Sequence, residues 1–219
     1  MQNFDVFVDT ADSRAPVQGF LHRTALPGAD CLILTHGAGA NCRSLLLTTL
    51  GDAFCAAGLT VLRCDLPFRQ SRPHGPPPRG SAERDQEGLR AAVASMRHLT
   101  NGKIFLGGHS YGGRQASMLA ANEPGLVERL LLLSYPLHPP NQPAKLRTSH
   151  FSALHVPALF VHGVRDGFGS IPEMEAALKT IPACSQLIAI PGAGHELLTN
   201  RNRDEFTGKI VTALLSFTQ

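Results

Sequence analysis

Short apolar runs alternate along the chain with segments in which apolar residues recur at helical spacing. The run CLILTHG at residues 31–37 is continuous and stops at a glycine, which is typical of a strand buried on both faces. Comparable runs predict further buried strands over residues 59–67, 103–110, 127–137, 155–163 and 186–192. Residues 3–9 and 16–25 predict an opening pair of strands.

The segments between these runs place apolar residues three and four positions apart, which indicates helices. They cover residues 43–57, 82–100, 111–124, 171–182 and 203–217. Buried strands that alternate with helices require crossover connections between parallel neighbours. The sequence therefore predicts an α/β fold, with a mostly parallel sheet of about seven to eight strands and helices on both of its faces. Because the chain shows no internal repeat and no interdomain linker, residues 1–219 are expected to form one domain.

Composition and charge narrow the classes of partner. The net charge is +3, the basic residues are scattered, and aromatic residues make up only 6% of the chain, so no nucleic-acid partner is expected. No membrane partner is expected either, because no apolar run approaches the roughly 18 residues of a membrane span and the N-terminus does not resemble a signal peptide. Five cysteines without close pairs favour a reducing, cytoplasmic setting. Ten histidines show no zinc-ligand spacing, so neither a metal nor another cofactor is predicted.

The stretch GGHSYGGR at residues 107–114 surrounds one serine with glycines. Its central five residues match G-x-S-x-G, and the match lies between a predicted strand and a predicted helix. In that setting the serine occupies a sharp turn at the end of a strand, and glycines remove side chains that would clash there. An ordinary tight turn is the alternative, since short patterns recur by chance. Ser110 is the predicted nucleophile.

A serine hydroxyl becomes an effective nucleophile only when a base takes its proton and a third group orients that base. His195 follows the last predicted strand in the loop PGAGHE, and Asp166 follows the strand at 155–163. The chain order of nucleophile, acid and base is one that α/β enzymes with a serine triad use. Asp166 has the alternative of capping its own turn or the next helix, and Asp65 and Glu196 are the rival acids.

The loop HGAGAN follows the first buried strand, and its glycines allow backbone N–H groups to converge on developing negative charge. The amides of Ala38 and Tyr111 are the predicted oxyanion donors. His36 is expected to fix the shape of this loop. His109 and His162 are expected to pack in the interior rather than to take part in the chemistry.

Arg69 and Arg72 follow the carboxyl end of the strand at 59–67, which is the side of the sheet where such folds bind ligands. The planar fork of arginine binds carboxylates through two parallel hydrogen bonds, so both residues are candidates for substrate binding. The alternative is a pair of solvated loop arginines, because arginine side chains are mostly exposed. Arg114, on the helix after the nucleophile, is a candidate to bind the proline-rich loop that follows Arg72.

The motifs HGAGAN, GGHSYGGR, LSYPLHPP and VHGVRDGFG together resemble the α/β-hydrolase superfamily over nearly the whole chain. More narrowly, they resemble a lidless branch that includes dienelactone-hydrolase-like proteins, testis-expressed protein 30 and the scaffold subunit of the NSL acetyltransferase complex. Residues 138–154 are too few for the helical lid that many relatives insert between these strands. Dienelactone hydrolases proper carry a cysteine where this chain has Ser110, so that particular activity is not expected.

The residues and the resemblance together predict a serine hydrolase that acts on small soluble esters, lactones or thioesters. An open site without an apolar lid argues against a lipase. Two alternatives stay open: the same triad used to hydrolyse peptide or carbon–carbon bonds, and a non-catalytic interaction protein built on this fold. The sequence determines neither the natural substrate nor the oligomeric state.

Overall fold

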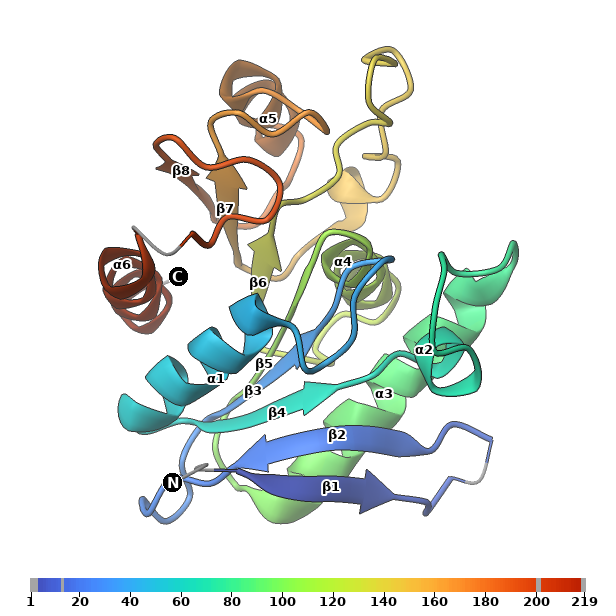
Figure 1. Ribbon diagram of the computed structural model, residues 1–219, viewed down its shortest axis with the longest axis vertical. Coiled ribbons are helices and arrows are strands. Elements are labelled where there is room, and N and C mark those ends of the chain that lie inside the picture. The colour runs from blue at the N-terminus through green and yellow to red at the C-terminus, as the bar shows by residue number, and fades with distance from the viewer. Residues whose placement is uncertain (1–3, 13, 200–201, 218–219) are drawn as a thin grey trace.

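One sheet runs through the molecule, with its strands in the order β1-β2-β4-β3-β5-β6-β7-β8 (Figure 1). The structure is a computed structural model that describes residues 4–12, 14–199 and 202–217. β1 and β2 pair antiparallel, β2 pairs antiparallel with β4, and every later pairing is parallel. The strands are β1 (Asp5–Asp9), β2 (Val17–His22), β3 (Cys31–Thr35), β4 (Thr60–Cys64), β5 (Ile104–His109), β6 (Arg129–Leu133), β7 (Ala158–Gly163) and β8 (Ser185–Ile190).

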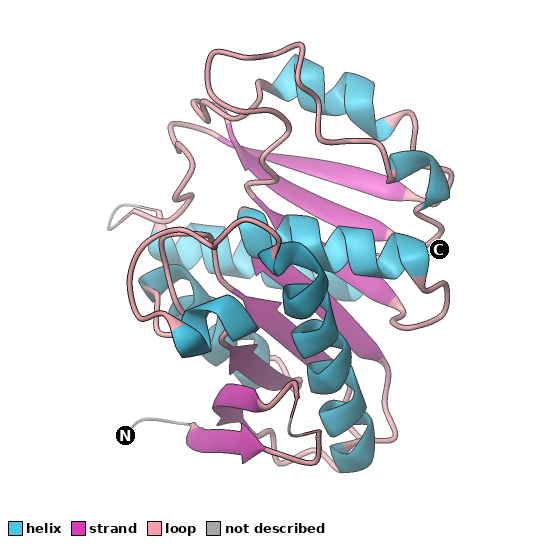
Figure 2. Cartoon of the chain, turned by 90° about the vertical axis from the view of Figure 1, so that its right-hand side faces the viewer, coloured by secondary structure: helices cyan, strands magenta, loops and turns pink. Residues whose placement is uncertain are grey.

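Helices cover both faces of this sheet (Figure 2). α1 and α6 pack against one face, and α3, α4 and α5 pack against the other. The α-helices are α1 (Leu45–Ala56), α2 (Pro67–Ser71), α3 (Ser81–Leu99), α4 (Tyr111–Asn122), α5 (Ile171–Leu178) and α6 (Arg203–Ser216). The predicted fold class, a mostly parallel α/β sheet with helices on both faces, is confirmed.

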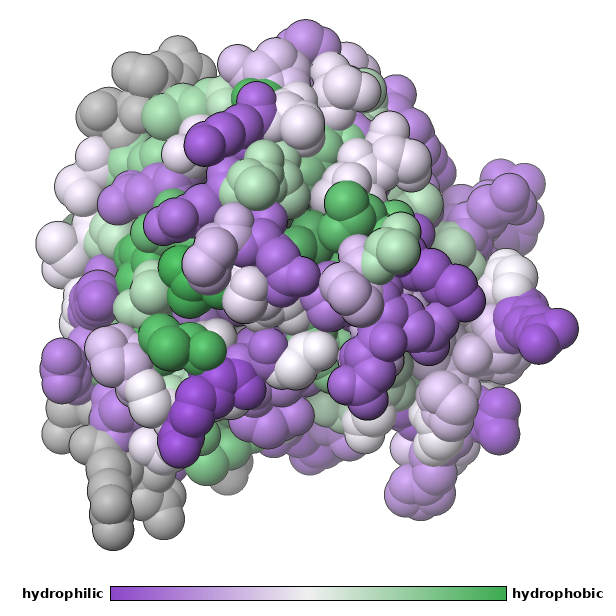
Figure 3. All heavy atoms as spheres, turned by 90° about the horizontal axis from the view of Figure 1, so that it is seen from above, coloured by the Kyte–Doolittle hydropathy of each residue, from purple (hydrophilic) through white to green (hydrophobic). Residues whose placement is uncertain are grey.

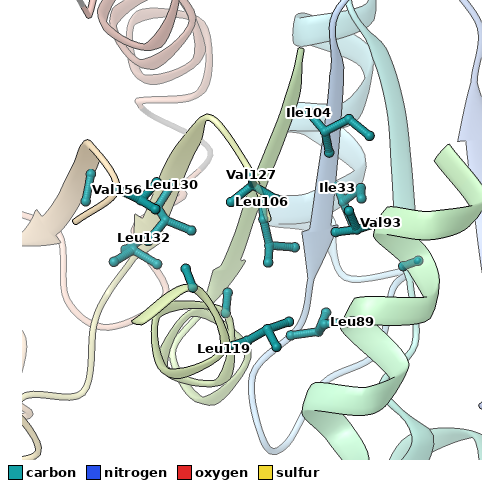
Figure 4. Packing of buried hydrophobic residues seen from close by; sticks show 14 of the residues in the cluster. Ile33, Leu89, Val93, Ile104, Leu106, Leu119, Val127, Leu130, Leu132 and Val156 are labelled. Carbon is teal, nitrogen blue, oxygen red and sulfur yellow. The ribbon is translucent and has the colours of Figure 1, made fainter. Parts of the chain in front are cut away.

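Alternate residues of each central strand belong to two separate cores. Ile33 packs with the α3 and α4 side of the sheet, whereas Leu32 and Leu34 pack with the α1 side. Figure 4 shows the first of these cores, in which Ile33 and Leu106 lie close to the helix residues. Both faces of the strand are therefore buried, which is why the sequence shows continuous apolar runs rather than alternation. Each fully buried aliphatic side chain contributes about 1.5–3 kcal/mol to the free energy of unfolding.

The structure departs from the expected elements in the segment after β4. The sequence predicts a strand through residue 67 and an irregular loop beyond it, but β4 ends at Cys64 and the short helix α2 follows. Pro67 begins this helix, where its missing N–H costs no hydrogen bond. α2 buries Phe68 and Arg69 against the rest of the molecule. Residue 3, the expected start of the first strand, lies outside the described residues.

Residues 134–157, which connect β6 to β7 and are all described, contain only the 3-10 helix η1 (Phe151–Ala153). The fold therefore has no inserted lid domain at this position, as the sequence predicts. Within the described ranges, no helix has the length and apolar character needed to cross a bilayer. Hydrophilic and hydrophobic residues are interspersed over the face seen from above (Figure 3).

Candidate active site

Ser110 lies at the corner between β5 and α4. β5 ends at His109 and α4 begins at Tyr111, so the candidate nucleophile is the one residue between strand and helix. Its φ is 50° and its ψ is −114°, a backbone conformation that residues with a side chain rarely adopt. The Ser110 amide donates to the carbonyl of Leu133 at 2.8 Å, which ties the corner to the neighbouring strand β6.

The glycines around Ser110 are required by the close approach of α4 to the sheet. A Cβ added to Gly112 would lie 2.5 Å from the carbonyl oxygen of His36, and one added to Gly113 would lie 2.6 Å from that of Gly108. A Cβ on Gly108 would lie 2.8 Å from the Gly112 carbonyl carbon. Contacts this short exclude any larger residue unless the backbone shifts, so the glycines allow the sharp corner to form.

The structure brings Ser110, His195 and Asp166 together in a chain of hydrogen bonds. His195 Nε2 lies 2.8 Å from Ser110 Oγ, and His195 Nδ1 lies 2.8 Å from Asp166 Oδ2. Because an ionised carboxylate only accepts, Nδ1–H donates to Asp166, and Nε2 is left to accept the Ser110 proton. The rival acid Asp65 instead accepts from the Cys42 amide at 2.7 Å.

The Asp166 carboxylate is buried but charged. Its side chain is 0% exposed, whereas that of His195 is 21% exposed. Burial by itself would raise the pKa of Asp166, but hydrogen bonds from His195 and the Phe168 amide outweigh it, so the pKa lies below its ordinary value. Asp166 is therefore an anion at neutral pH, which allows it to stabilise positive charge on the His195 ring.

Several contacts hold His195 in place. Its carbonyl oxygen accepts from Ser134 Oγ at 2.6 Å and from His109 Nε2 at 2.8 Å. The ring of Phe168 lies 4.3 Å from the His195 ring, centroid to centroid. His109 is buried, as predicted, and also bonds to the loop that carries His195, a role that the sequence does not reveal.

The loop after β3 lies beside Ser110 and is shaped by His36. His36 Nδ1 donates to the Gly37 carbonyl at 2.8 Å, while its Nε2 accepts from the Leu66 amide at 3.1 Å. A Cβ added to Gly37 would lie 3.5 Å from the Cβ of Ser110. The loop that carries the predicted donor Ala38 is thus adjacent to Ser110, and His36 has the position expected for a residue that fixes the shape of this loop.

The structure corrects the predicted role of Arg69. The sequence places it as a ligand for the substrate, but its guanidinium is buried and faces the protein backbone. It donates to the carbonyl oxygens of Ala38 and Ala40 at 2.8 Å and to those of Arg72 and Gly75 at 2.9 Å. Four of its five N–H donors are used in this way, so Arg69 joins the loop after β3 to the proline-rich loop rather than presenting a free fork.

Arg72 is exposed, and its guanidinium lies beside Gly75. Its role in substrate binding stays a prediction. No hydrogen bond joins Arg114 to the proline-rich loop among the described residues, and this expected contact stays a prediction. The Arg114 charge acts to lower the pKa values of Tyr135, Arg147 and His150, which belong to the segment after β6.

Comparison with known proteins supports the same fold. The family model for the alpha/beta hydrolase domain matches residues 28–217. The chain belongs to the α/β-hydrolase family. A dienelactone hydrolase from Anabaena variabilis superposes with a TM-score of 0.77 at 18% identity, over 99% of this chain and 100% of that one. An α/β serine hydrolase homologue from Coxiella burnetii superposes with a TM-score of 0.77 at 20% identity, over 98% of each chain. Est1E from Butyrivibrio proteoclasticus superposes with a TM-score of 0.74 at 16% identity, over 96% of this chain and 97% of that one.

In this α/β-hydrolase a buried carboxylate bonds to the residue that follows Ser110. Asp85, on α3, accepts from the Tyr111 hydroxyl at 2.7 Å and from the Phe68 amide at 3.0 Å. Burial raises the pKa of Asp85, and the two hydrogen bonds oppose that rise. Asp85 thereby joins α2, α3 and the first residue of α4. The sequence offers only one signal for it, a carboxylate within an otherwise polar helix.

His162, on β7, is a second histidine beside the Asp166 carboxylate. It is fully buried, as predicted, and its Nε2 donates to the Gly169 carbonyl at 2.8 Å. The same nitrogen lies 3.7 Å from Asp166 Oδ2. Burial lowers the pKa of His162, so the ring is neutral at neutral pH and leaves the Asp166 charge to His195.

Proposed function

We propose that this α/β-hydrolase is a serine hydrolase that cleaves carboxylic esters, lactones or thioesters of small substrates. One observation carries the proposal: Ser110 Oγ, His195 and Asp166 form an unbroken chain with two 2.8 Å hydrogen bonds. A hydroxyl, a base within reach of its proton and a buried anion that orients the base are what nucleophilic acyl transfer requires.

In the first half of the proposed reaction, His195 Nε2 takes the Ser110 proton as Oγ attacks the carbonyl carbon of the substrate. The positive charge that develops on the ring is stabilised by Asp166 through Nδ1–H. The carbonyl oxygen becomes an oxyanion, and the amides of Ala38 and Tyr111 are the proposed donors to it. His195 then protonates the leaving oxygen or sulfur, which leaves an acyl group on Ser110.

In the second half, water replaces the leaving group. His195 Nε2 takes a proton from water, the hydroxide attacks the acyl carbon, and the same ring returns the proton to Ser110 Oγ. The acid is released and the resting hydrogen bonds form again. The strained φ of 50° at Ser110 supports this assignment, because strain of this kind is common at nucleophiles on a strand-to-helix corner.

The absence of a lid between β6 and β7 supports small, soluble substrates over lipid interfaces. Two solved structures of similar fold are a dienelactone hydrolase and an esterase domain. Each shares only 18% identity with this chain, so this similarity shows the fold alone. We also propose a cytoplasmic setting, because the five cysteines are unpaired.

The proposal is tested with p-nitrophenyl acetate, an aryl lactone and an acyl-CoA. We expect the wild-type protein to hydrolyse at least one of them, and Ser110→Ala and His195→Ala to lower kcat by about 10⁴-fold or more. Ser216→Ala, an exposed serine on α6, is the matched control and should keep full activity. Retention of the activity by Ser110→Ala would overturn the proposal.

A further inference from the structure

Arg114 lies one helical turn beyond Ser110. Its amide donates to the Ser110 carbonyl at 3.0 Å in the first turn of α4. Helical side chains lean toward the N-terminus of their helix, so Arg114 extends toward the corner that carries the nucleophile. Its Nε is buried and has no hydrogen-bond partner among the described residues.

Arg147 approaches the same place from the segment after β6. Its amide donates to the Leu137 carbonyl at 2.8 Å, and its carbonyl accepts from the Tyr135 hydroxyl at 2.6 Å. Leu137 comes shortly after the end of β6, the strand that pairs with β5 beside Ser110. The backbone of Arg147 is therefore fixed close to the carboxyl edge of the sheet, where the candidate site lies.

The two guanidinium groups have no acid to balance them. None of the ion pairs of the described residues includes Arg114 or Arg147. They are near enough to affect each other: burial and the Arg114 charge both lower the pKa of Arg147. Two half-buried positive charges that repel each other cost free energy, and a bound anion would relieve that cost.

His150, three residues after Arg147, bonds to α4 and carries no charge at neutral pH. Burial and the Arg114 charge lower the pKa of His150 to about 4, so its ring is uncharged at neutral pH. His150 Nε2 lies 2.8 Å from Ser117 Oγ, which donates to the Arg114 carbonyl at 2.9 Å. The positive charge beside Ser110 is therefore concentrated on Arg114 and Arg147, and the N-terminus of α4 adds a partial positive charge.

We propose that Arg114 and Arg147 form an oxyanion-binding subsite beside Ser110, which holds a carboxylate or phosphate group of the substrate. Arginine suits this role because its planar fork binds either group through two hydrogen bonds. Arg114 follows Ser110 by four residues, about 6 Å along a helix axis, so an anion held by its side chain is expected a few carbon atoms from the scissile carbonyl. The subsite rests on the proposed hydrolase function and names its substrate class: esters with a negatively charged acyl chain.

The first test compares two esters that differ only in charge. They are p-nitrophenyl hemiglutarate and the uncharged ester in which an isopropyl group replaces the carboxylate, each corrected for hydrolysis without enzyme. Arg114→Gln and Arg147→Gln should lower kcat/KM for the hemiglutarate by about ten- to a hundredfold more than for the uncharged ester. Lys179→Gln, an exposed residue after α5, removes the same charge and should change neither value. Equal losses on both esters would overturn the subsite.

The second test needs no turnover. Glutarate and inorganic phosphate are titrated by calorimetry into Ser110→Ala at constant ionic strength. Saturable binding that is lost on adding Arg114→Gln is the expected result, and the tighter of the two ligands identifies the carboxylate or the phosphate as the preferred group. Binding of this kind in a protein without esterase activity would support the subsite while the hydrolase proposal fails. If neither anion binds, or if binding survives Arg114→Gln, the subsite is overturned.

Near-ultraviolet circular dichroism shows whether each variant is folded, and Arg114→Lys provides a more conservative substitution than Arg114→Gln. Lysine keeps the charge but loses the fork, so a folded Arg114→Lys protein should show a weaker preference for the charged ester than the wild type. If Arg114→Gln does not fold, the same comparisons are made with Arg114→Lys and Arg147→Gln.

Discussion

His36 Nδ1 donates a 2.8 Å hydrogen bond to the carbonyl oxygen of Gly37. The N–H of a trans peptide points away from its C=O, so this bond fixes the direction of the Ala38 amide, the proposed oxyanion donor. We predict that His36→Leu lowers kcat by about ten- to a hundredfold, since loss of a whole oxyanion donor costs about 10²–10³. Steady-state kinetics of His36→Leu measure this effect. The exposed residue His155, changed to leucine, is the control, and an unchanged kcat in His36→Leu would show that this hydrogen bond does not orient an oxyanion donor.

Arg69 secures the other side of the same loop through the Ala38 and Ala40 carbonyls. Arg69→Gln should therefore lower kcat for p-nitrophenyl hemiglutarate and its uncharged isostere by similar factors, because the effect acts on the loop rather than on substrate charge. The pair of esters measured side by side distinguishes this result from a substrate clamp. A loss confined to the charged ester would restore Arg69 as a substrate ligand.

The hydrogen bond between Tyr111 and Asp85 couples the start of α4 to α3. Tyr111→Phe removes the donor and leaves the buried Asp85 with the Phe68 amide alone, so we expect a loss of about 1–3 kcal/mol in the free energy of unfolding. Urea denaturation of Tyr111→Phe, Asp85→Asn and the double variant measures the coupling. Fully additive losses would show that the two side chains do not interact energetically.

His22 makes the stability depend on pH. Burial and the Arg63 charge lower its pKa from the ordinary 6.5 to about 4 in the folded protein. Between pH 4 and pH 6.5 the unfolded chain binds more protons than the folded protein. The contribution of neutral His22 to the free energy of unfolding is therefore complete above pH 6.5 and is lost as the pH falls toward 4.

Denaturation of wild type and His22→Gln at several pH values checks this sign. Glutamine can still accept from Arg63 Nε, which lies 2.8 Å from His22 Nε2, but it does not titrate. The wild type should lose more free energy of unfolding than His22→Gln across this range, by about 1–3 kcal/mol. If the free energy of unfolding falls equally with pH in the two proteins, a group other than His22 causes the acid sensitivity.

The sequence predicted the fold because the pattern of buried strands and helices is local and strong. The same reasoning places Ser110, Asp166 and His195 after the carboxyl ends of three strands, β5, β7 and β8, and in the structure two hydrogen bonds of His195 join them. It failed for Arg69. A pattern of loop residues gives no sign of which arginine folds inward, and the four hydrogen bonds from this side chain to backbone carbonyls depend on loops that meet only in three dimensions.

Other features of the site depend on tertiary structure in the same way. Asp85 is separated from Tyr111 by a strand and a loop, and Ser134 reaches His195 from another strand end. The helix α2 is too short for its periodicity to be visible, and only the position of Pro67 indicates where it begins.

The proposed function depends on Ser110 being a nucleophile that His195 activates. Intact-protein mass spectrometry after treatment with a fluorophosphonate tests it directly, because only an activated serine reacts at an appreciable rate. We predict one adduct per chain, mapped by peptide analysis to Ser110 and absent from Ser110→Ala and His195→Ala. A folded wild-type protein that remains unlabelled, or that is labelled at another residue, would show that Ser110 is not an activated nucleophile.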